Sequence, residues 1–245
     1  MYTYIAVDVL NIAHRLFDEN DKSLCRISNK TVYLNLVRDF LDITQYWKKK
    51  FLSEDGSFFF LFDNPTSRDK LKDMFEPLDA HMSRKEKFSE YKSNRVAMPK
   101  EFYNSVDLIK WYFMMNESLY KCVRINHIEA DDLVKPFIDH GKANKDIPFK
   151  ALLITNDSDW CRFLDEDVDY LPQLYEEPRT YKDFRQQYGY FPSEDYIVLY
   201  KIVHGDNADN VKSAFPDLKP ARRSIITDKC SSIKELYTNL KNLGF

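Results

Sequence analysis

The stretch Ile128-Glu129-Ala130-Asp131-Asp132-Leu133-Val134 places three carboxylates within four residues, between apolar neighbours. It predicts the start of a helix, on which Glu129 and Asp132 share a face and Asp131 lies beside them. Like charges this close raise one another's pKa, and a bound cation would neutralise them. A helix N-terminus also attracts carboxylates through its dipole. Taken alone, the stretch therefore favours neither a charged first turn nor a cation site.

The strands predicted on both sides of this helix end in carboxylates. Residues 2–7 run into Asp8, residues 57–62 into Asp63, and residues 150–155 into Asp157 and Asp159. Shorter strands are predicted at residues 120–125 and 168–171. Because strands and helices alternate, we expect an α/β fold with a central, mostly parallel sheet flanked by helices. Ligands of such sheets bind at the carboxyl ends of the strands, where these acids would converge.

Helices are predicted over residues 29–52 and 100–119 from the spacing of apolar residues, and the helix of the opening stretch is expected to end at His140-Gly141. From residue 180 the chain reads as helical, with one helix at residues 193–204 and two short helices in the tail. We therefore divide the chain into an α/β core, residues 1–179, and a helical region, residues 180–245. Residues 66–100 form a basic helical insertion in the core.

Composition narrows the class of protein. The 245 residues carry a net charge of −3, contain only 5 glycines and show no glycine-rich phosphate-binding motif. The four cysteines are far apart, which argues against a zinc finger and against a disulfide framework and favours a reducing compartment. No signal-peptide pattern or membrane-spanning run is present. We expect a soluble, cytoplasmic monomer that does not bind membranes, in the host cytoplasm if the source is a virus.

The acids indicate a site for hard divalent cations, because magnesium and manganese prefer oxygen ligands and the histidines and cysteines of a zinc site are missing. Two such ions, roughly 4 Å apart, promote the hydrolysis of phosphodiesters. Eight basic residues between Arg68 and Arg95 could bind the backbone phosphates. The candidate metal ligands are Asp8, Asp63, Glu129, Asp131, Asp132, Asp157, Asp159, Asp206 and Asp209.

These residues make the chain resemble the 5′-nuclease, or flap endonuclease-like, superfamily over roughly residues 1–215. Within it, the chain is most similar to bacteriophage 5′–3′ exonucleases of the RNase H type and to the 5′-nuclease domain of bacterial DNA polymerase I. The matching pieces are Asp8, Phe62-Asp63, Arg84 with Tyr91-Lys92-Ser93-Asn94-Arg95, Glu129-Ala130-Asp131-Asp132, Thr155-Asn156-Asp157-Ser158-Asp159 and Gly205-Asp206-x-x-Asp209-Asn210.

The resemblance implies a PIN-like nuclease core, a helical arch over residues 66–100 and a C-terminal helical DNA-binding region. It implies two metal ions, magnesium with manganese as a substitute. Asp8, Asp63, Glu129 and Asp131 would bind the first ion, and Asp132, Asp157, Asp159 and Asp209 the second, with Asp206 nearby. It also implies that Arg84 and Lys92 are catalytic residues of the arch that grip the scissile phosphate, supported by Arg95. Arg68 and Lys85 would add phosphate contacts.

One segment departs from the family pattern. The family has a glycine-rich turn after its G-D-x-x-D-N motif, and this turn binds duplex backbone, often with a potassium ion. Here Ser213, Asp217 and Lys219 stand where glycines would be, which weakens the case for potassium because such turns use positive φ angles. Four basic residues could bind the same phosphates by charge: Lys212, Lys219, Arg222 and Arg223.

The function that the resemblance implies is a divalent-metal-dependent 5′-nuclease, a 5′–3′ exonuclease or flap endonuclease, that acts during DNA replication or repair. Its substrates would be DNA with 5′ ends, nicks or flaps, and RNA primers in RNA–DNA hybrids. Replisome proteins are candidate partners. Two alternatives stay open. One is a PIN-like ribonuclease, which shares the sheet but has fewer acids. The other is a non-catalytic nucleic-acid-binding replisome protein that kept the fold.

Overall fold

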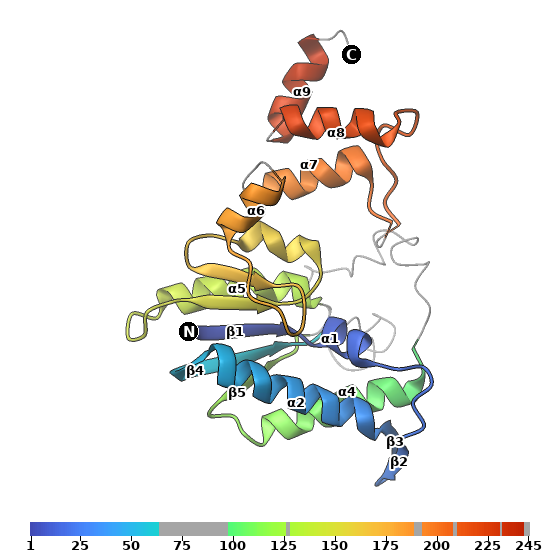
Figure 1. The fold of residues 1–245 in the computed structure, drawn as a ribbon, viewed down its shortest axis with the longest axis vertical. Coiled ribbons are helices and arrows are strands. Elements are labelled where there is room, and N and C mark those ends of the chain that lie inside the picture. The colour runs from blue at the N-terminus through green and yellow to red at the C-terminus, as the bar shows by residue number, and fades with distance from the viewer. Residues whose placement is uncertain (64–97, 126–127, 189–192, 208–209, 231, 243–245) are drawn as a thin grey trace, which may run out of the picture.

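The centre of the molecule is a five-stranded parallel sheet in the order β5-β4-β1-β6-β7 (Figure 1). The computed structural model describes residues 1–63, 98–125, 128–188, 193–207, 210–230 and 232–242. The predicted α/β sheet is confirmed, and all of its strand pairs are parallel. Its strands are β1 (Tyr2–Asp8), β4 (Leu52–Leu61), β5 (Tyr120–Val123), β6 (Ala151–Ile154) and β7 (Val168–Leu171).

Helices cover both faces of this sheet, because successive side chains of β1 point to opposite sides. Ile5 and Val7 pack against helices α1 (Val9–Leu16), α2 (Leu34–Phe51) and α4 (Lys100–Met114). Tyr4 and Ala6 pack on the other face, against helix α5 (Ala130–Ala143) and the 3₁₀ helix η2 (Ser158–Phe163). The alternation of large apolar residues along one central strand therefore builds two cores.

Four helices make up the C-terminal region: α6 (Tyr181–Tyr188), α7 (Glu194–His204), α8 (Pro220–Lys229) and α9 (Ile233–Asn242). Tyr181 and Phe184 of α6 pack against the core that contains Tyr4 and Ala6. Helices α7, α8 and α9, stacked at one end of the molecule in Figure 1, share a third, smaller core. Tyr196, Leu199 and Val203 of α7 pack there with Leu236 of α9. No helix among the described residues combines the length and the apolar character needed to cross a membrane.

The expectation of one helix over residues 29–52 is wrong at its N-terminal end. Residues Lys30–Tyr33 form strand β3, which pairs antiparallel with β2 (Leu24–Ile27), and the helix begins only at Leu34. Ser28, with φ 58°, makes the turn of this hairpin. The hairpin is held against α4, because the Tyr33 amide donates to Ser105 Oγ at 2.8 Å. Tertiary contacts here override the helical spacing of the sequence.

The expectation that Gly141 ends its helix is also wrong. Helix α5 continues to Ala143, and Gly141 is buried inside it. A Cβ at this position would lie 2.4 Å from Cε2 of Phe149, so the glycine admits the close packing of that ring. The glycine that suggested a helix end in the sequence is explained instead by its packing against Phe149.

Phe60 of β4 gives a direct test of the larger core. Its ring is fully buried and stacks on Phe113 of α4, with the ring centroids 4.1 Å apart. We expect Phe60→Ala to lower the free energy of unfolding by about 3–5 kcal/mol, because it removes the ring and leaves a cavity. Trp111→Ala, at a side chain of the same helix that is 59% exposed, is the control and should cost less than about 1 kcal/mol. Equal losses in chemical denaturation would contradict this account.

Candidate active site

The strand order creates one crevice at the carboxyl edge of the sheet. From β1 the chain moves to β4 and β5 on one side, and later to β6 and β7 on the other. The direction of winding therefore reverses between β1 and β6, and this switch point is where α/β sheets bind ligands. Asp8 ends β1 at this point, and Asn156 and Asp157 follow β6. A hydrogen bond from Asn11 Nδ2 to Asn156 Oδ1, 2.5 Å long, bridges the two sides.

Asp8 is the most buried carboxylate of the crevice, with 7% of its surface exposed. Its Oδ1 accepts a hydrogen bond from the Asn11 amide at 3.2 Å, and its Oδ2 accepts one from the Thr155 hydroxyl at 3.0 Å. Both donors are neutral. Burial raises the pKa of Asp8 well above its usual range, and the nearby charges of Asp63 and Asp131 raise it further. The site therefore concentrates negative charge in a place with little water.

Asp63 joins the acidic start of α5 to the edge of the sheet. It follows β4, and its Oδ1 accepts a hydrogen bond from the backbone amide of Ala130 at 2.6 Å. Ala130 is the first residue of α5, so a side chain from another strand caps this helix. Glu129 is the N-cap residue. Asp131 and Asp132 lie in the first turn of the helix, where Asp131 is half-buried and Asp132 is exposed.

Asp131 connects the two halves of the carboxylate cluster. Its Oδ1 accepts a hydrogen bond from the indole of Trp160 in η2 at 2.9 Å. Asp157 is the N-cap of η2 and accepts a hydrogen bond from the amide of Asp159 at 2.9 Å. Burial raises the pKa of Asp157 to about 6, and the charges of Asp131 and Asp159 add to the effect. Asp131 thus acts electrostatically on both Asp8 and Asp157, the acids that flank the switch point.

Lys201 of α7 supplies positive charge to the other end of the cluster. Its ammonium group binds the carboxylate of Asp159 and that of Asp206, the latter at 2.7 Å. Burial disfavours the charged form, but the bonds to the two carboxylates outweigh it and raise the pKa of Lys201. Lys201 therefore brings Asp159, from the core, together with Asp206, from the turn after α7.

The structure brings together most of the predicted acids but does not present a finished metal site. Asp8, Asp63, Asp131, Asp157 and Asp159 meet at the carboxyl edge, and Asp206 joins them through Lys201. Within the described ranges, no three Asp, Glu, His or Cys side chains are already gathered around one cation position. Asp209 lies outside those ranges.

The predicted nucleic-acid-binding residues fall into two groups. Those of the basic insertion lie outside the described residues: Arg68, Arg84, Lys85, Lys92 and Arg95. Three residues of the C-terminal region, Lys212, Lys219 and Arg222, are exposed, and they make no ion pair within the part of the chain that the structure describes. Arg223 differs from them, because it is half-buried and its guanidinium donates to backbone carbonyls.

The sequence did not single out three residues that shape the site: Thr155, Trp160 and Lys201. Lys201 could have been found in the sequence, because it is the only charged residue between Tyr196 and Val203 and precedes Asp206 by five positions. A lone cation in an apolar helix next to an acidic turn indicates an ion pair. Thr155 and Trp160 carried no comparable signal, because their partners come from distant strands and helices.

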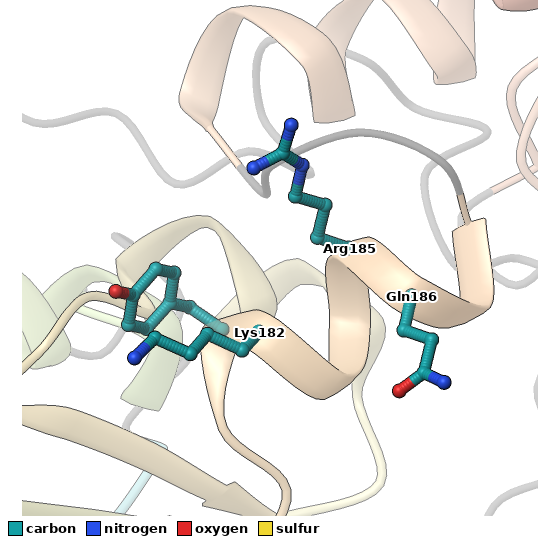
Figure 2. A pocket seen from close by; sticks show the side chains of 4 residues that line it. Lys182, Arg185 and Gln186 are labelled. Atoms are coloured by element: carbon teal, nitrogen blue, oxygen red, sulfur yellow. The ribbon is translucent and has the colours of Figure 1, made fainter.

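A separate hollow of about 420 Å³ lies along α6 (Figure 2). It is lined by Tyr181, Lys182, Arg185 and Gln186. No carboxylate lines it, and all four residues come from one helix. It is therefore a surface feature distinct from the carboxylate cluster.

Fold and site together define a class of protein: a parallel α/β fold with carboxylates gathered at the topological switch point. The chain belongs to the family of 5′–3′ exonuclease N-terminal resolvase-like domains, whose family model matches residues 3–189. The expected kinship with 5′-nucleases is thus confirmed.

Named relatives agree with this family. The chain is 27% identical over 156 residues to a 5′–3′ exonuclease of Buchnera aphidicola subsp. Schizaphis graminum, an alignment covering 64% of this chain and 52% of that protein. It is 23% identical over 171 residues to DNA polymerase I of Caldicellulosiruptor bescii, covering 66% of this chain and 19% of the polymerase. The chain thus spans about half the length of the first relative and a smaller part of the second.

Solved structures share the fold. The 5′-exonuclease of bacteriophage T5 with bound zinc superposes with a TM-score of 0.67 at 18% identity, covering 97% of this chain and 79% of that one. The T5 flap endonuclease in a complex with DNA and metal ions gives a TM-score of 0.63 at 18% identity, covering 95% and 77%. At this level of identity the likeness establishes the fold alone.

The raised pKa of Asp157 predicts a pH-dependent loss of stability. The unfolded chain ionises this group near its usual value of 3.8, whereas the folded protein does so only near 6. Stability is therefore lost as the pH rises through this interval, and the loss persists above it. Without divalent cations, Asp157→Asn should raise the free energy of unfolding by about 1–3 kcal/mol near neutral pH and change it little near pH 4.

Chemical denaturation with a chelator at the two pH values measures this effect. The control is Asp139→Asn, which removes an exposed carboxylate of α5 that is paired with Lys135. It should not stabilise the protein at either pH. A destabilised Asp157→Asn variant near neutral pH would contradict the assigned repulsion.

Proposed function

We propose that the protein is a divalent-metal-dependent 5′-nuclease that hydrolyses phosphodiester bonds at the 5′ ends or flaps of DNA. The observation that carries the proposal is the electrostatic coupling of Asp8, Asp63 and Asp131 across the switch point. Three separate elements bring these acids to one crevice, and buried carboxylates so arranged are stabilised by a cation. Membership of the 5′–3′ exonuclease family supports the same reaction class.

The residues fit hard divalent cations by their chemistry, since the side chains proposed as ligands are all carboxylates. Asp8, Asp63, Glu129 and Asp131 would hold one ion. Asp132, Asp157, Asp159 and Asp209, with Asp206 nearby, would hold a second. Magnesium is the proposed ion, with manganese as a substitute. Bound there, the ions would activate a water molecule and stabilise charge on the phosphate and the leaving oxygen.

The chain's own residues prepare this chemistry. Asp63 fixes the first turn of α5 at the edge of the sheet through the Ala130 amide. Trp160 orients Asp131, and Thr155 orients Asp8. Lys201 holds Asp159 and Asp206 together, so a cation bound between these two carboxylates would displace its ammonium group or share them with it.

The proposed substrate is DNA with a 5′ end, a nick or a flap, together with RNA primers in hybrids. The structure of the T5 flap endonuclease with DNA and metal ions supports the choice of DNA through the shared fold. Arg84 and Lys92 are proposed to grip the scissile phosphate, with Arg68, Lys85 and Arg95 as further phosphate contacts. In the C-terminal region, Lys212, Lys219 and Arg222 are exposed cations that could bind duplex backbone.

Removing two acids that follow β6 tests the reaction. The double variant Asp157→Ala, Asp159→Ala should lose cleavage of a 5′-flap duplex in magnesium by at least about 10³-fold, because the proposed second cation loses two ligands. The control is Asp165→Ala, Asp167→Ala, which has the same spacing just beyond η2 and should keep full activity. Full activity of the first variant, or cleavage of single-stranded RNA in place of flap DNA by the wild type, would overturn the proposal.

The basic insertion has its own test. Arg84→Ala and Lys92→Ala should each lower the rate of single-turnover cleavage by about 10²-fold. Each should lower duplex affinity by less than about 3-fold, because a group at the scissile phosphate acts mainly in the transition state. Lys72→Ala, in the same segment, is the matched control. Equal losses of cleavage and affinity would mean that Arg84 and Lys92 only anchor phosphate.

A further inference from the structure

The turn between α7 and α8, residues 205–219, achieves its shape with a single glycine. Gly205 has φ 81°, and a Cβ there would lie 2.8 Å from both the Val211 carbonyl oxygen and the Ser213 amide nitrogen. Asn210, with φ 59°, is the other residue with positive φ among the described residues of the turn. Ser213, Asp217 and Lys219 therefore stand without backbone strain where the family pattern has glycines.

Arg223 closes this turn from the first part of α8. Its guanidinium donates hydrogen bonds to three backbone carbonyl oxygens: that of Phe215 at 3.1 Å, that of Pro216 at 3.1 Å and that of His204 at 3.4 Å. The fork of five N–H donors in arginine can serve three acceptors that lie in different directions. One side chain thus ties the end of α7 to the middle of the turn.

The three carbonyls form a site for a cation. His204 is the last residue of α7, and the carbonyls at a helix C-terminus lack intrahelical partners and carry the negative end of the dipole. Potassium binds to converging backbone carbonyls in the same way. Here the guanidinium already uses these oxygens. The Ser213 hydroxyl is engaged as well, since it donates to the Val203 carbonyl and accepts from the Phe215 amide. The residues of this turn therefore do not fit a potassium ion.

We propose that Arg223 is the resident cation of the turn: its guanidinium occupies the place of a bound alkali-metal ion and makes the turn independent of potassium. In this role Arg223 is a positioning residue. It holds the segment that carries Lys212, Lys219 and Arg222, whose side chains are exposed. The inference about duplex binding rests on the proposed function, whereas the inference about the turn does not.

Hydrogen exchange in the free protein tests the turn directly. The reporters are the amides of Val211, Ala214 and Leu218, which donate to the carbonyls of Asp206, Ile202 and Phe215. Arg223→Ala should speed their exchange by about tenfold or more, because local opening becomes easier, while the strands of the sheet stay protected. Arg222→Ala, at the exposed neighbour, should leave these amides unchanged. Unchanged exchange in Arg223→Ala would overturn the proposal.

Duplex affinity gives the second readout. Wild-type affinity for a flap duplex, measured without divalent cations, should agree within about twofold between potassium, sodium and lithium chloride at equal ionic strength, because general screening is the same. Arg222→Ala should lower the slope of affinity against salt by about one, as loss of a phosphate contact does. A wild-type affinity that requires potassium would overturn the proposal.

Failure of the proposed function and failure of the proposed role of Arg223 would give different results. If the protein bound no duplex under any condition, the proposed function would fail, yet the exchange measurement would still decide the role of Arg223. If duplex affinity were normal and Arg223→Ala changed only the salt slope, Arg223 would be a phosphate contact like its neighbour and the proposal would be wrong.

Discussion

The hydrogen bond from the Ala130 amide to Asp63 decides where the acidic helix meets the sheet. It joins the end of β4 to the first residue of α5, across 67 positions of sequence. Together with the packing of α5 on Tyr4 and Ala6, it fixes the carboxylates of the first turn of α5 relative to Asp8. The bond places the Asp63 carboxylate at the N-terminus of α5, the positive end of the helix dipole, next to other acids. One cap thus brings together charges that otherwise repel.

Repulsion between the carboxylates of the crevice lowers the stability of the fold at the site proposed to bind cations. Burial and neighbouring charges raise the pKa of Asp8 and of Asp157, so ionisation of these groups destabilises the folded protein. Such charge persists where a ligand removes the penalty, and a divalent cation does so most effectively. Lys201 compensates Asp159 and Asp206 from within the chain. Part of the charge balance is therefore internal, and the proposed divalent cations would supply the rest.

The sequence was sufficient to predict what depends on local pattern. Buried runs such as residues 150–155 predicted the strands. The acids after them predicted the edge that carries the site, because the carboxyl ends of parallel strands lie at one edge of a sheet. It was insufficient where distant contacts decide. The hairpin before Leu34 depends on its bond to Ser105, and Gly141 depends on the ring of Phe149. Arg223 was predicted to contact phosphate because the sequence shows its charge. The sequence does not show the backbone carbonyls to which its guanidinium donates.

The last turn of helix α7 takes part in two contacts with basic side chains. Lys201 in its last turn binds the acids of the core and of the following turn, and the carbonyl of its last residue, His204, binds Arg223 of α8. The residues between them cover less than one helical turn, so α7 cannot move at one contact without moving at the other. Asp159 and the turn that presents Lys212 and Lys219 are therefore both held by the last turn of α7. The carboxylate crevice and the proposed duplex-binding turn share one rigid element, and each constrains the position of the other.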